Sequence, residues 1–449
     1  MQERDDQPLT LGATSRDLKS YQTISMPDQK AEKSTRWAQA TSFQLVYSMV
    51  NTGMALCILP LEADRLNEGN GSIWVGIYLV ICGSTQLICP LAGKISDLHE
   101  SEWGRRRPFI VAGTFAAIMS LAIIQAASAN LWPITFMVGL LFAQISLNVV
   151  FAVQCGLPAD IQSGVWGPRD PVKGRECTGI VSGYVAAHSF IGSLSAVAVV
   201  VAAQGMPLQV QYTCFMACLA IVCTLVCCSV QEESTVYLAG RPVPPRPEVP
   251  KMSIAEMIMG SFYLDLDGDR DFFWVCFGRC FYYVSTSVAV FLLYYIRDML
   301  HVSDEDELRT KLATLIVTAQ LVGALVTLPA GRASNAFGRK PVLYVACCMM
   351  AFTFLLWIMA PTLSPEHRWP MVLFAGVSYG VGSGSYLSVD YALAMDCLPK
   401  GKSYAEAFGL WGVAGFFGST VGPMIGGFIL ASTQIDSSDG KLTKEGHYG

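Results

Sequence analysis

Charged side chains are scarce in this sequence of 449 residues. Asp, Glu, Lys and Arg make up only 14% of it, whereas 52% is hydrophobic and the mean hydropathy is +0.43. That balance excludes an ordinary soluble domain and places the chain in the membrane class. The net charge of -5 arises largely in polar tails and loops rather than on one acidic face, so the sequence predicts no nucleic-acid partner.

Motifs for several kinds of chemistry are also missing. The chain has no GxxxxGKS-type loop, which excludes pumping by ATP hydrolysis within this chain. The acidic run Asp265, Asp267 and Asp269 lacks the glycine and the glutamate of a calcium loop, since Cys276 stands at the twelfth position. We therefore predict no enzymatic activity, no cofactor and no metal site.

Cysteine is present but poorly placed for disulfides. Most of the 15 cysteines lie inside apolar segments, and the loops predicted outside the cell or compartment contain almost none. Small apolar filler is the preferred interpretation, over a disulfide framework or a metal site.

Apolar segments of about 20 residues, long enough to span a hydrocarbon core of about 30 Å, recur along the chain. A polar tail precedes the first of them, so no cleaved signal peptide is expected. The predicted spans are 42–61, 73–93, 108–129, 132–156, 178–203, 210–230, 272–296, 312–331, 341–360, 370–397 and 404–431.

Lys and Arg set the orientation of these spans. With the N-terminal tail in the cytoplasm, the connections on that side carry about three times as many Lys and Arg residues as those on the other side. The N-terminus is therefore predicted to be cytoplasmic, in a plasma or vacuolar membrane.

A polar stretch divides the apolar sequence into two comparable halves. We predict a cytoplasmic tail at 1–41, a six-helix bundle at 42–230, a cytoplasmic linker at 231–270, a second bundle at 271–431 and an extracytoplasmic polar end at 432–449. The second bundle holds only five spans. A twelfth helix is expected to be missing from this sequence, through truncation or an incomplete gene model, with a genuine eleven-span protein as the alternative.

The linker contains two smaller features. Its proline-rich run at 241–250 is interpreted as a semi-rigid spacer, with an adaptor-binding motif as the alternative. Residues 251–262 are expected to form a short interfacial helix with Met252, Ile254, Met257 and Ile258 on its apolar side.

Polar side chains form stripes on four of the spans. Positions three, four or seven residues apart share one face of a helix. The stripes are Gln44, Ser48 and Asn51 in the first span, Gln144 and Asn148 in the fourth, Arg279, Tyr283 and Thr286 in the seventh, and Tyr379, Ser383, Tyr386 and Asp390 in the tenth. His188, in the fifth span, is interpreted as a structural hydrogen-bonding residue, with a proton relay as the alternative.

Arg279 and Asp390 are the two charges of these stripes. Counted from Asp271 and from Pro399, each lies eight or nine residues inside its span, or roughly 12 to 14 Å at 1.5 Å per residue. A charge at that depth costs at least about 2.5 to 3.5 kcal/mol, so it is usually paired or functional. We expect the two side chains to face each other.

One loop motif occurs in both halves. Its first copy is Gly93, Asp97, Gly104, Arg105 and Arg106, after the second span. Its second copy is Gly331, Asn335, Gly338, Arg339 and Lys340, after the eighth span. A repeat at an offset of six spans predicts two six-helix units that face the same way.

These residues resemble the signature of the major facilitator superfamily. The first copy, GKISDLHESEWGRRRPFI, is expanded in a way that is similar to the sucrose transporters and related glycoside:cation symporters. Further similarity lies in Pro158, Asp160, Lys173, Gly174, Arg175, Ser182, Gly183, in RDFFWVCFGR at 270–279 and in VDYALAMDCLP at 389–399. The sucrose transporters resemble one another in an arginine of the fourth helix. Gln144, Asn148 and Gln154 are the polar residues there in this chain, which argues against sucrose itself.

The resemblance implies a function for each stripe. In this superfamily helices one, four, seven and ten line a central cavity, so the ten neutral stripe residues named above become candidate substrate contacts. Arg279 and Asp390 become a candidate coupling pair, in which protonation of Asp390 releases Arg279. The alternative is a permanent ion pair that only orients two helices.

The loop motifs resemble the cytoplasmic latch of the superfamily. There the acid after helix two approaches the start of helix eleven, where Ser403 and Glu406 form a capping-box pattern. The candidate gating residues are Asp97, Gly104, Arg105, Arg106, Arg175, Arg339 and Glu406. Asn335 replaces the acid in the second copy, so that latch is expected to be weaker and insensitive to pH.

The sequence therefore predicts an all-helical, multi-pass membrane protein with a major facilitator fold. Its expected function is proton-coupled symport of a sugar or glycoside by alternating access, in a monomer bound to the lipid bilayer. The alternatives are an exporter of amphipathic small molecules by antiport, and a membrane receptor or inactive remnant. Asn70 begins a glycosylation motif, but its position beside the second span argues against occupancy.

Overall fold

The structure is a computed structural model that describes residues 37–67, 71–162, 171–203, 206–230, 232, 237–238, 241–242, 253–302, 304–399 and 401–437. Residues outside the described part include most of the predicted tail, Asn70, the linker residues 231, 233–236, 239–240 and 243–252, which contain most of the proline-rich run and Met252, and the polar end after 437.

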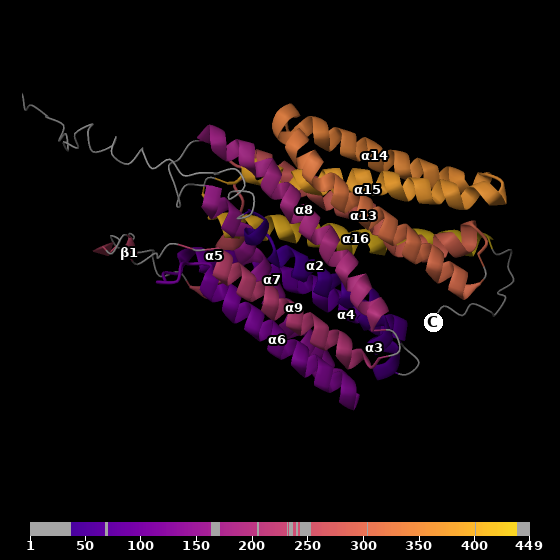
Figure 1. Ribbon diagram of the computed structural model, residues 1–449, viewed down its shortest axis with the longest axis horizontal. Helices are drawn as coiled ribbons and strands as arrows, with labels where there is room; N and C mark the ends of the chain where they lie inside the picture. Colours follow the sequence, from indigo (N-terminus) through magenta and orange to yellow (C-terminus); the bar gives the residue numbers. More distant parts are fainter. Residues whose placement is uncertain are drawn as a thin grey trace, which may run out of the picture.

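The described chain is almost entirely helical (Figure 1). The first half contains α2 (Phe43–Gly53), η1 (Met54–Ile58), α3 (Leu59–Leu66), α4 (Gly71–Ser84), η2 (Thr85–Ile88), α5 (Cys89–Leu98), α6 (Arg107–Asn130), α7 (Pro133–Gln162), α8 (Pro171–Ala202) and α9 (Leu208–Ser229). The connecting segment contains β1 (Tyr237–Leu238), β2 (Arg241–Pro242) and α10 (Ile254–Phe262). The second half contains α11 (Arg270–Thr286), η3 (Ser287–Phe291), α12 (Leu292–Tyr294), η4 (Tyr295–Met299), α13 (Glu305–Phe337), α14 (Arg339–Met359), η5 (Ala360–Thr362), α15 (Pro365–Asp396) and α16 (Tyr404–Ser437).

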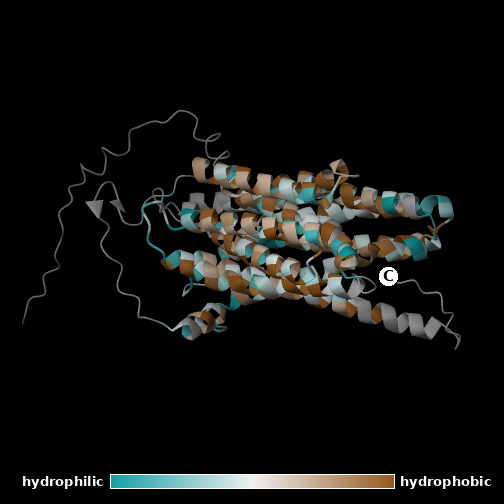
Figure 2. Ribbon diagram, turned by 90° about the horizontal axis from the view of Figure 1, so that it is seen from below, coloured by the Kyte–Doolittle hydropathy of each residue, from teal (hydrophilic) through white to brown (hydrophobic). Residues whose placement is uncertain are grey.

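Ten helices in the described chain are long and apolar enough to cross a membrane, from Trp74–Leu98 to Tyr404–Gly426. They coincide with ten of the eleven predicted spans. The first predicted span, 42–61, lies in the unbroken helical run formed by α2, η1 and α3. Hydrophobic residues predominate along the bundle and hydrophilic ones gather near its ends (Figure 2). The all-helical membrane fold predicted from the sequence is confirmed.

The helices lie in two groups, each with its own apolar core. The core of the first group runs from Phe43 to Val230, and that of the second includes Leu315, Trp357 and Val372. In Figure 1 the indigo to magenta helices α6, α7 and α9 lie together below, and the orange α13, α14 and α15 lie together above. We call the end that carries Arg105, Arg339 and Lys402 the basic end and the opposite end the far end. The basic end is at the left of Figure 1.

Glycines bring the two groups into close contact toward the basic end. A side chain at Gly93 would overlap the backbone of Ala405, and one at Gly409 would overlap the backbone of Cys89 and Pro90. Gly331 of α13 similarly faces Gly179 of α8. Because backbones meet directly at these crossings, the halves are closed against each other at the basic end.

The two copies of the loop motif turn in the same way. Gly104 has φ +90° and Gly338 has φ +92°, a left-handed conformation that favours glycine. Each turn leads into the next helix, α6 at Arg107 and α14 at Arg339. The internal repeat expected from the sequence therefore has a matching backbone geometry.

Two helices are irregular toward the far end. The run from α2 to α3 contains the π-helical η1, and the run after α11 passes through the 3₁₀ segment η3 and the π-helical η4. Such departures from α geometry inside a helix often mark hinges or functional sites. The first and seventh spans share this feature, as expected for repeated units.

Candidate functional site

Arg279 and Asp390 are in direct contact. Arg279 Nη1 donates to Asp390 Oδ2, and the two residues are only 7% and 3% exposed. Arg279 lies nine residues into α11, about 14 Å along the axis, and Asp390 lies six residues before the end of α15, about 9 Å. Asp390 is shallower than counted from Pro399, because α15 ends at Asp396. The pair is buried between apolar helices, where an unpaired charge would be expensive.

Aromatic rings enclose the guanidinium group. The Arg279 Cζ lies 3.4 Å from the centre of the Trp411 ring and 4.9 Å from that of Tyr283, and Arg279 Nη2 donates to the Tyr283 hydroxyl at 3.3 Å. Arg279 Nε and Trp411 Nε1 are buried donors for which the described residues offer no acceptor. Cation–π contacts are attractive when desolvated, so the cation has favourable contacts besides Asp390.

Tyr386 and Ser383, two of the predicted residues of α15, meet a residue that the stripes did not include. Tyr282 stacks on Tyr386 with 3.7 Å between ring centres, and its hydroxyl hydrogen-bonds Ser383 Oγ at 3.1 Å. Tyr379 packs against the same cluster and stacks on Trp357. Thr286 Oγ1 donates to the carbonyl of Tyr283. The predicted stripes of α11 and α15 therefore meet in one polar and aromatic region.

The first half contributes a second hydrogen-bonded group. Tyr47 donates to Asn148 Oδ1 at 2.8 Å, and Asn148 donates to Thr85 Oγ1 at 2.8 Å. Tyr47 also stacks on Phe151, which faces Gly412 of α16. This group contains no charge.

The other predicted residues of the first half bond to one another and to neighbouring groups of α2 and α8. Gln44 donates to Ser48 at 3.2 Å and to Ser189 at 2.7 Å, and Asn51 donates to the carbonyl of Tyr47 at 3.0 Å. Gln144 is 3% exposed. His188 Nδ1 lies 3.1 Å from Thr41 Oγ1, in an interhelical hydrogen bond.

The stripe reasoning missed Trp411, Tyr282, Tyr47 and Thr85. Tyr47 and Thr85 lie between or outside the stripe positions, and Tyr282 is adjacent to Tyr283 on a neighbouring face. A search for Trp and Tyr within spans, rather than for polar spacing alone, would have included Trp411. It could not have placed its ring on Arg279, because the residues belong to different helices.

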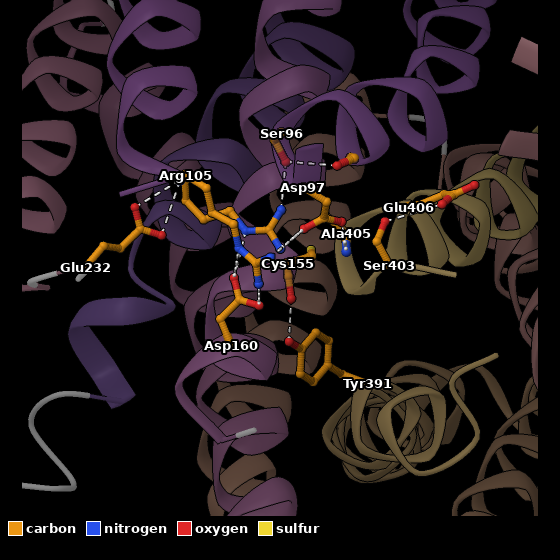
Figure 3. Close-up of polar contacts among 12 residues, drawn as sticks. Ser96, Asp97, Arg105, Cys155, Asp160, Glu232, Tyr391, Ser403, Ala405 and Glu406 are labelled. Carbon is orange, nitrogen blue, oxygen red and sulfur yellow. Dashed lines mark hydrogen bonds and ion pairs between the residues drawn. The ribbon is translucent and has the colours of Figure 1, made fainter. Parts of the chain in front are cut away.

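At the basic end, Asp97 connects the halves (Figure 3). Its Oδ2 accepts a hydrogen bond from the backbone N–H of Ala405 at 3.1 Å, and its Oδ1 pairs with Arg106. Arg106 Nε also donates to Asp160 at 2.8 Å, and Arg105 pairs with the same carboxylate. A carboxylate here caps the positive start of α16, as an anion at a helix N-terminus should.

The second copy makes a similar contact with an amide. Asn335 Oδ1 accepts from the backbone N–H of Gly179 at 3.1 Å and from Arg339 Nη1 at 2.6 Å. Arg339 Nε donates to Asp396 at 3.0 Å. The contact thus joins α13 to α8 at a position eight residues after α8 begins, whereas the Asp97 contact joins α5 to the start of α16.

Glu406 differs from a capping-box residue. It accepts from Lys402 Nζ at 3.0 Å and from the Ser403 hydroxyl at 3.3 Å, and it lies 3.6 Å from Lys94 Nζ. These are contacts between side chains. The backbone N–H of Ala405, at the start of the helix, donates to Asp97 instead. Arg175 lies in α8, but its side chain is outside what the structure describes.

Glu232 holds the start of α6. Its Oε2 accepts from the backbone N–H groups of Arg106 at 2.9 Å and Arg107 at 3.0 Å. Burial raises the pKa of this carboxyl above its ordinary value, although the two N–H bonds and the Arg106 charge oppose the shift.

Comparisons with known proteins agree with this architecture. Residues 275–437 match the family model described as Major Facilitator Superfamily. No curated protein matches the chain. Among solved structures, a bacterial homologue of the iron transporter ferroportin in an outward-facing state is 11% identical over 88% of this chain and 92% of that one, with a TM-score of 0.64.

Two further structures are similar over comparable lengths. The human organic anion transporter MFSD10 is 14% identical over 87% of this chain and 92% of its own, with a TM-score of 0.62. The fucose:proton symporter FucP of E. coli is 14% identical over 89% and 92%, with a TM-score of 0.62. The chain therefore has the fold of the major facilitator superfamily transporters.

Proposed function

We propose that this chain is a secondary active transporter that moves a sugar or glycoside together with protons by alternating access. The observation that carries the proposal is the buried ion pair of Arg279 and Asp390. Ionisable residues inside a membrane are rare and typically mark substrate or ion pathways.

The pair has the parts that a proton-dependent switch requires. Protonation of Asp390 removes the negative partner of Arg279, while Trp411 and Tyr283 keep favourable contacts with the cation. The guanidinium then turns toward a substrate oxygen without being left unsolvated. Protonation and substrate binding become linked, because each changes the free energy of the other.

A polyhydroxyl substrate fits the neutral groups around the pair. The hydroxyls and amides of Tyr47, Asn51, Asn148, Tyr283 and Tyr386 offer donors and acceptors, and the tyrosine rings offer apolar faces for a sugar ring. Gln44, Ser48, Gln144, Thr286, Tyr379 and Ser383 are secondary candidates from the same stripes. The similarity to FucP, a fucose:proton symporter, supports this substrate class and coupling ion.

The conformational change of transport would be the alternate opening of the two ends of the bundle. The closed basic end and the similarity to structures in outward conformations support a state that opens at the far end. The irregular segments η1, η3 and η4 are hinges for closing that end. Release of the Asp97 and Asn335 contacts would then open the basic end.

Export of amphipathic organic compounds is the second candidate. It is favoured by the similarity to MFSD10, described as an organic anion transporter, and by the aromatic residues around Arg279. Such an exporter would accept a bulky organic anion in preference to a neutral sugar.

The test uses purified protein in vesicles with an imposed pH gradient and a panel of radiolabelled sugars, sugar acids and organic anions. We expect accumulation of a neutral sugar that rises with the gradient. Asp390→Asn should lose gradient-driven accumulation by at least tenfold, about 1.4 kcal/mol of coupling, and retain exchange down a gradient. Glu307→Gln, an exposed acid far from the pair, is the control.

Two results would reject the proposal. Undiminished pH-driven accumulation by Asp390→Asn would make the ion pair purely structural. Accumulation of organic anions but of no sugar would favour the exporter.

A further inference from the structure

The short helix α10 belongs neither to the membrane spans nor to the proposed transport site. Residues 254–262 begin with a capping box in which Ser253 accepts from the Glu256 N–H and Glu256 accepts from the Ser253 N–H. These two reciprocal hydrogen bonds fix the start of this nine-residue helix.

One side of α10 is held by the protein. Ser261 is 0% exposed and Leu264, just beyond the helix, packs in the cluster around Phe272 and Phe408. Lys402 Nζ donates to the carbonyls of Gly260 at 2.9 Å and of Ser261 at 3.1 Å. A lysine ammonium at the last carbonyls of a helix is favourable both as a cap and with the helix dipole.

The same lysine connects α10 to both halves. Glu406 of α16 accepts from Lys402, and Lys94 of α5 lies 3.6 Å from Glu406. Lys402 is 8% and Glu406 7% exposed at the side chain, so the group is largely shielded from water. Hydrogen bonds to charged groups contribute more to stability than hydrogen bonds between neutral groups. Lys402 therefore fastens α10 to the start of α16.

The other side of α10 is apolar and uncovered. Ile258 is 41% exposed, Met259 74% and Phe262 38%, and the apolar strip continues to Tyr263 at 70%. At 100° per residue, Ile258, Met259 and Phe262 share an arc that is turned away from the protein-facing Met257 and Ser261. The apolar side expected from the sequence placed Met257 and Ile258 together, whereas the structure separates them.

The position of α10 relative to the ends of the membrane spans indicates what covers its exposed apolar arc. The helix lies beside Lys94, four residues before the end of the span Trp74–Leu98, and beside Lys402, two residues before the span Tyr404–Gly426. That is about 6 Å or less from the span ends, within the headgroup region of a bilayer. Amphipathic helices at this level bury their apolar faces at the boundary of headgroups and acyl chains.

We propose that α10 binds the bilayer at its headgroup and acyl-chain boundary and, through Lys402, ties the start of α16 to the membrane surface. The contact of α16 with Asp97 is then anchored to the lipid as well as to α5. This proposal does not depend on the transported substrate.

The depth of α10 is tested in the full-length protein reconstituted in phosphatidylcholine vesicles. An environment-sensitive fluorescent amino acid is placed at Met259 or, as a water-exposed reference at the same end of the bundle, at Glu102 in the loop between α5 and α6. We expect nitroxide-labelled lipids to quench position 259 at least threefold more than position 102, and aqueous iodide to show the reverse order. Equal quenching by iodide at both positions would overturn the proposal. Protection of position 259 from both quenchers would also overturn it, because it would indicate that a protein partner covers this face.

The role of Lys402 is tested by hydrogen exchange. Lys402→Met should accelerate amide exchange in residues 258–263 about tenfold or more, because one charged hydrogen-bond donor to α10 is lost. Arg270→Met, which removes an exposed cation at the start of α11, should leave that exchange unchanged. Unchanged exchange in Lys402→Met would show that α10 is not fastened to α16. Both variants are compared only if they show the wild-type thermal transition.

Discussion

Single buried charges decide most of the chemistry proposed for this protein. Arg279 and Asp390 are stabilised by each other, and Trp411 adds a contact that no charge change removes. By contrast, Asp97 and Glu232 at the basic end bind backbone N–H groups, which are permanent donors. A change in protonation therefore has different consequences at the two places.

Glu232 shows this difference most directly. Because its pKa is raised by burial, the folded state binds a proton more readily than the unfolded state. The stability that this contributes is complete below the ordinary pKa of a glutamate and is lost as the pH rises through the raised pKa. Ionised Glu232 thus destabilises the protein relative to a neutral group of the same shape.

We expect Glu232→Gln to keep an oxygen acceptor for the Arg106 and Arg107 N–H groups and to lose this pH dependence. The melting temperature of the variant should equal that of the wild type near pH 4.5 and exceed it slightly at pH 8. Thermal unfolding in detergent across this range is the measurement. A variant that is less stable at every pH would show that the charge itself holds α6.

Helix crossings determine which end of the bundle is closed. Gly93 and Ala405 meet backbone to backbone, so any side chain at position 93 must push α5 away from α16. Overpacking of this kind costs typically about 1 to 3 kcal/mol, enough to shift a two-state equilibrium about tenfold.

We therefore expect Gly93→Val to favour opening at the basic end. Cys155, which is 6% exposed and whose carbonyl accepts from Tyr391 at 2.7 Å, should then react about tenfold faster with a maleimide, followed by mass spectrometry of its peptide. Gly76→Val is the matched control, since a side chain there meets nothing within 4 Å. Equal rates in both variants would contradict the role given to this crossing.

Much of this element-scale structure follows from the sequence. Apolar length predicted the spans, and the repeated motif with Gly104 and Gly338 predicted two repeated units, because only these local signals were needed. The stripe of α15 placed Tyr386 and Asp390 on one face for the same reason. The partners Trp411, Tyr282 and Lys402 could not be predicted, because they depend on how separate helices pack and on where α15 ends.

At the scale of the whole molecule, two contacts join the halves at the basic end, and we propose that they keep it closed. One uses the carboxylate of Asp97 and the other the amide of Asn335. Charge-assisted hydrogen bonds are roughly twice as strong as neutral ones, so the two sides should release unequally.

Asn335→Asp should make the contact at position 335 similar in strength to the Asp97 contact. We expect its carboxylate to strengthen the contacts with Gly179 and Arg339 and to slow maleimide labelling of Cys155 about three- to tenfold at pH 7.5, with a smaller effect at pH 5. Asp97→Asn should accelerate labelling over the same range. Identical behaviour of Asn335→Asp and the wild type at pH 7.5 would mean that the second contact does not limit opening.

The distance in sequence between the contacts of the basic end has a consequence for synthesis of the chain. The core of the first half is complete once residue 230 has been made, but the partners of Gly93 and Asp97 lie at 405 and 406. The first bundle must therefore reside in the membrane with this face uncovered while about 175 further residues are added, at roughly 5 to 20 residues per second. The closed end is among the last parts of the molecule to assemble, so a chaperone or lipid that covers this face would act before transport begins.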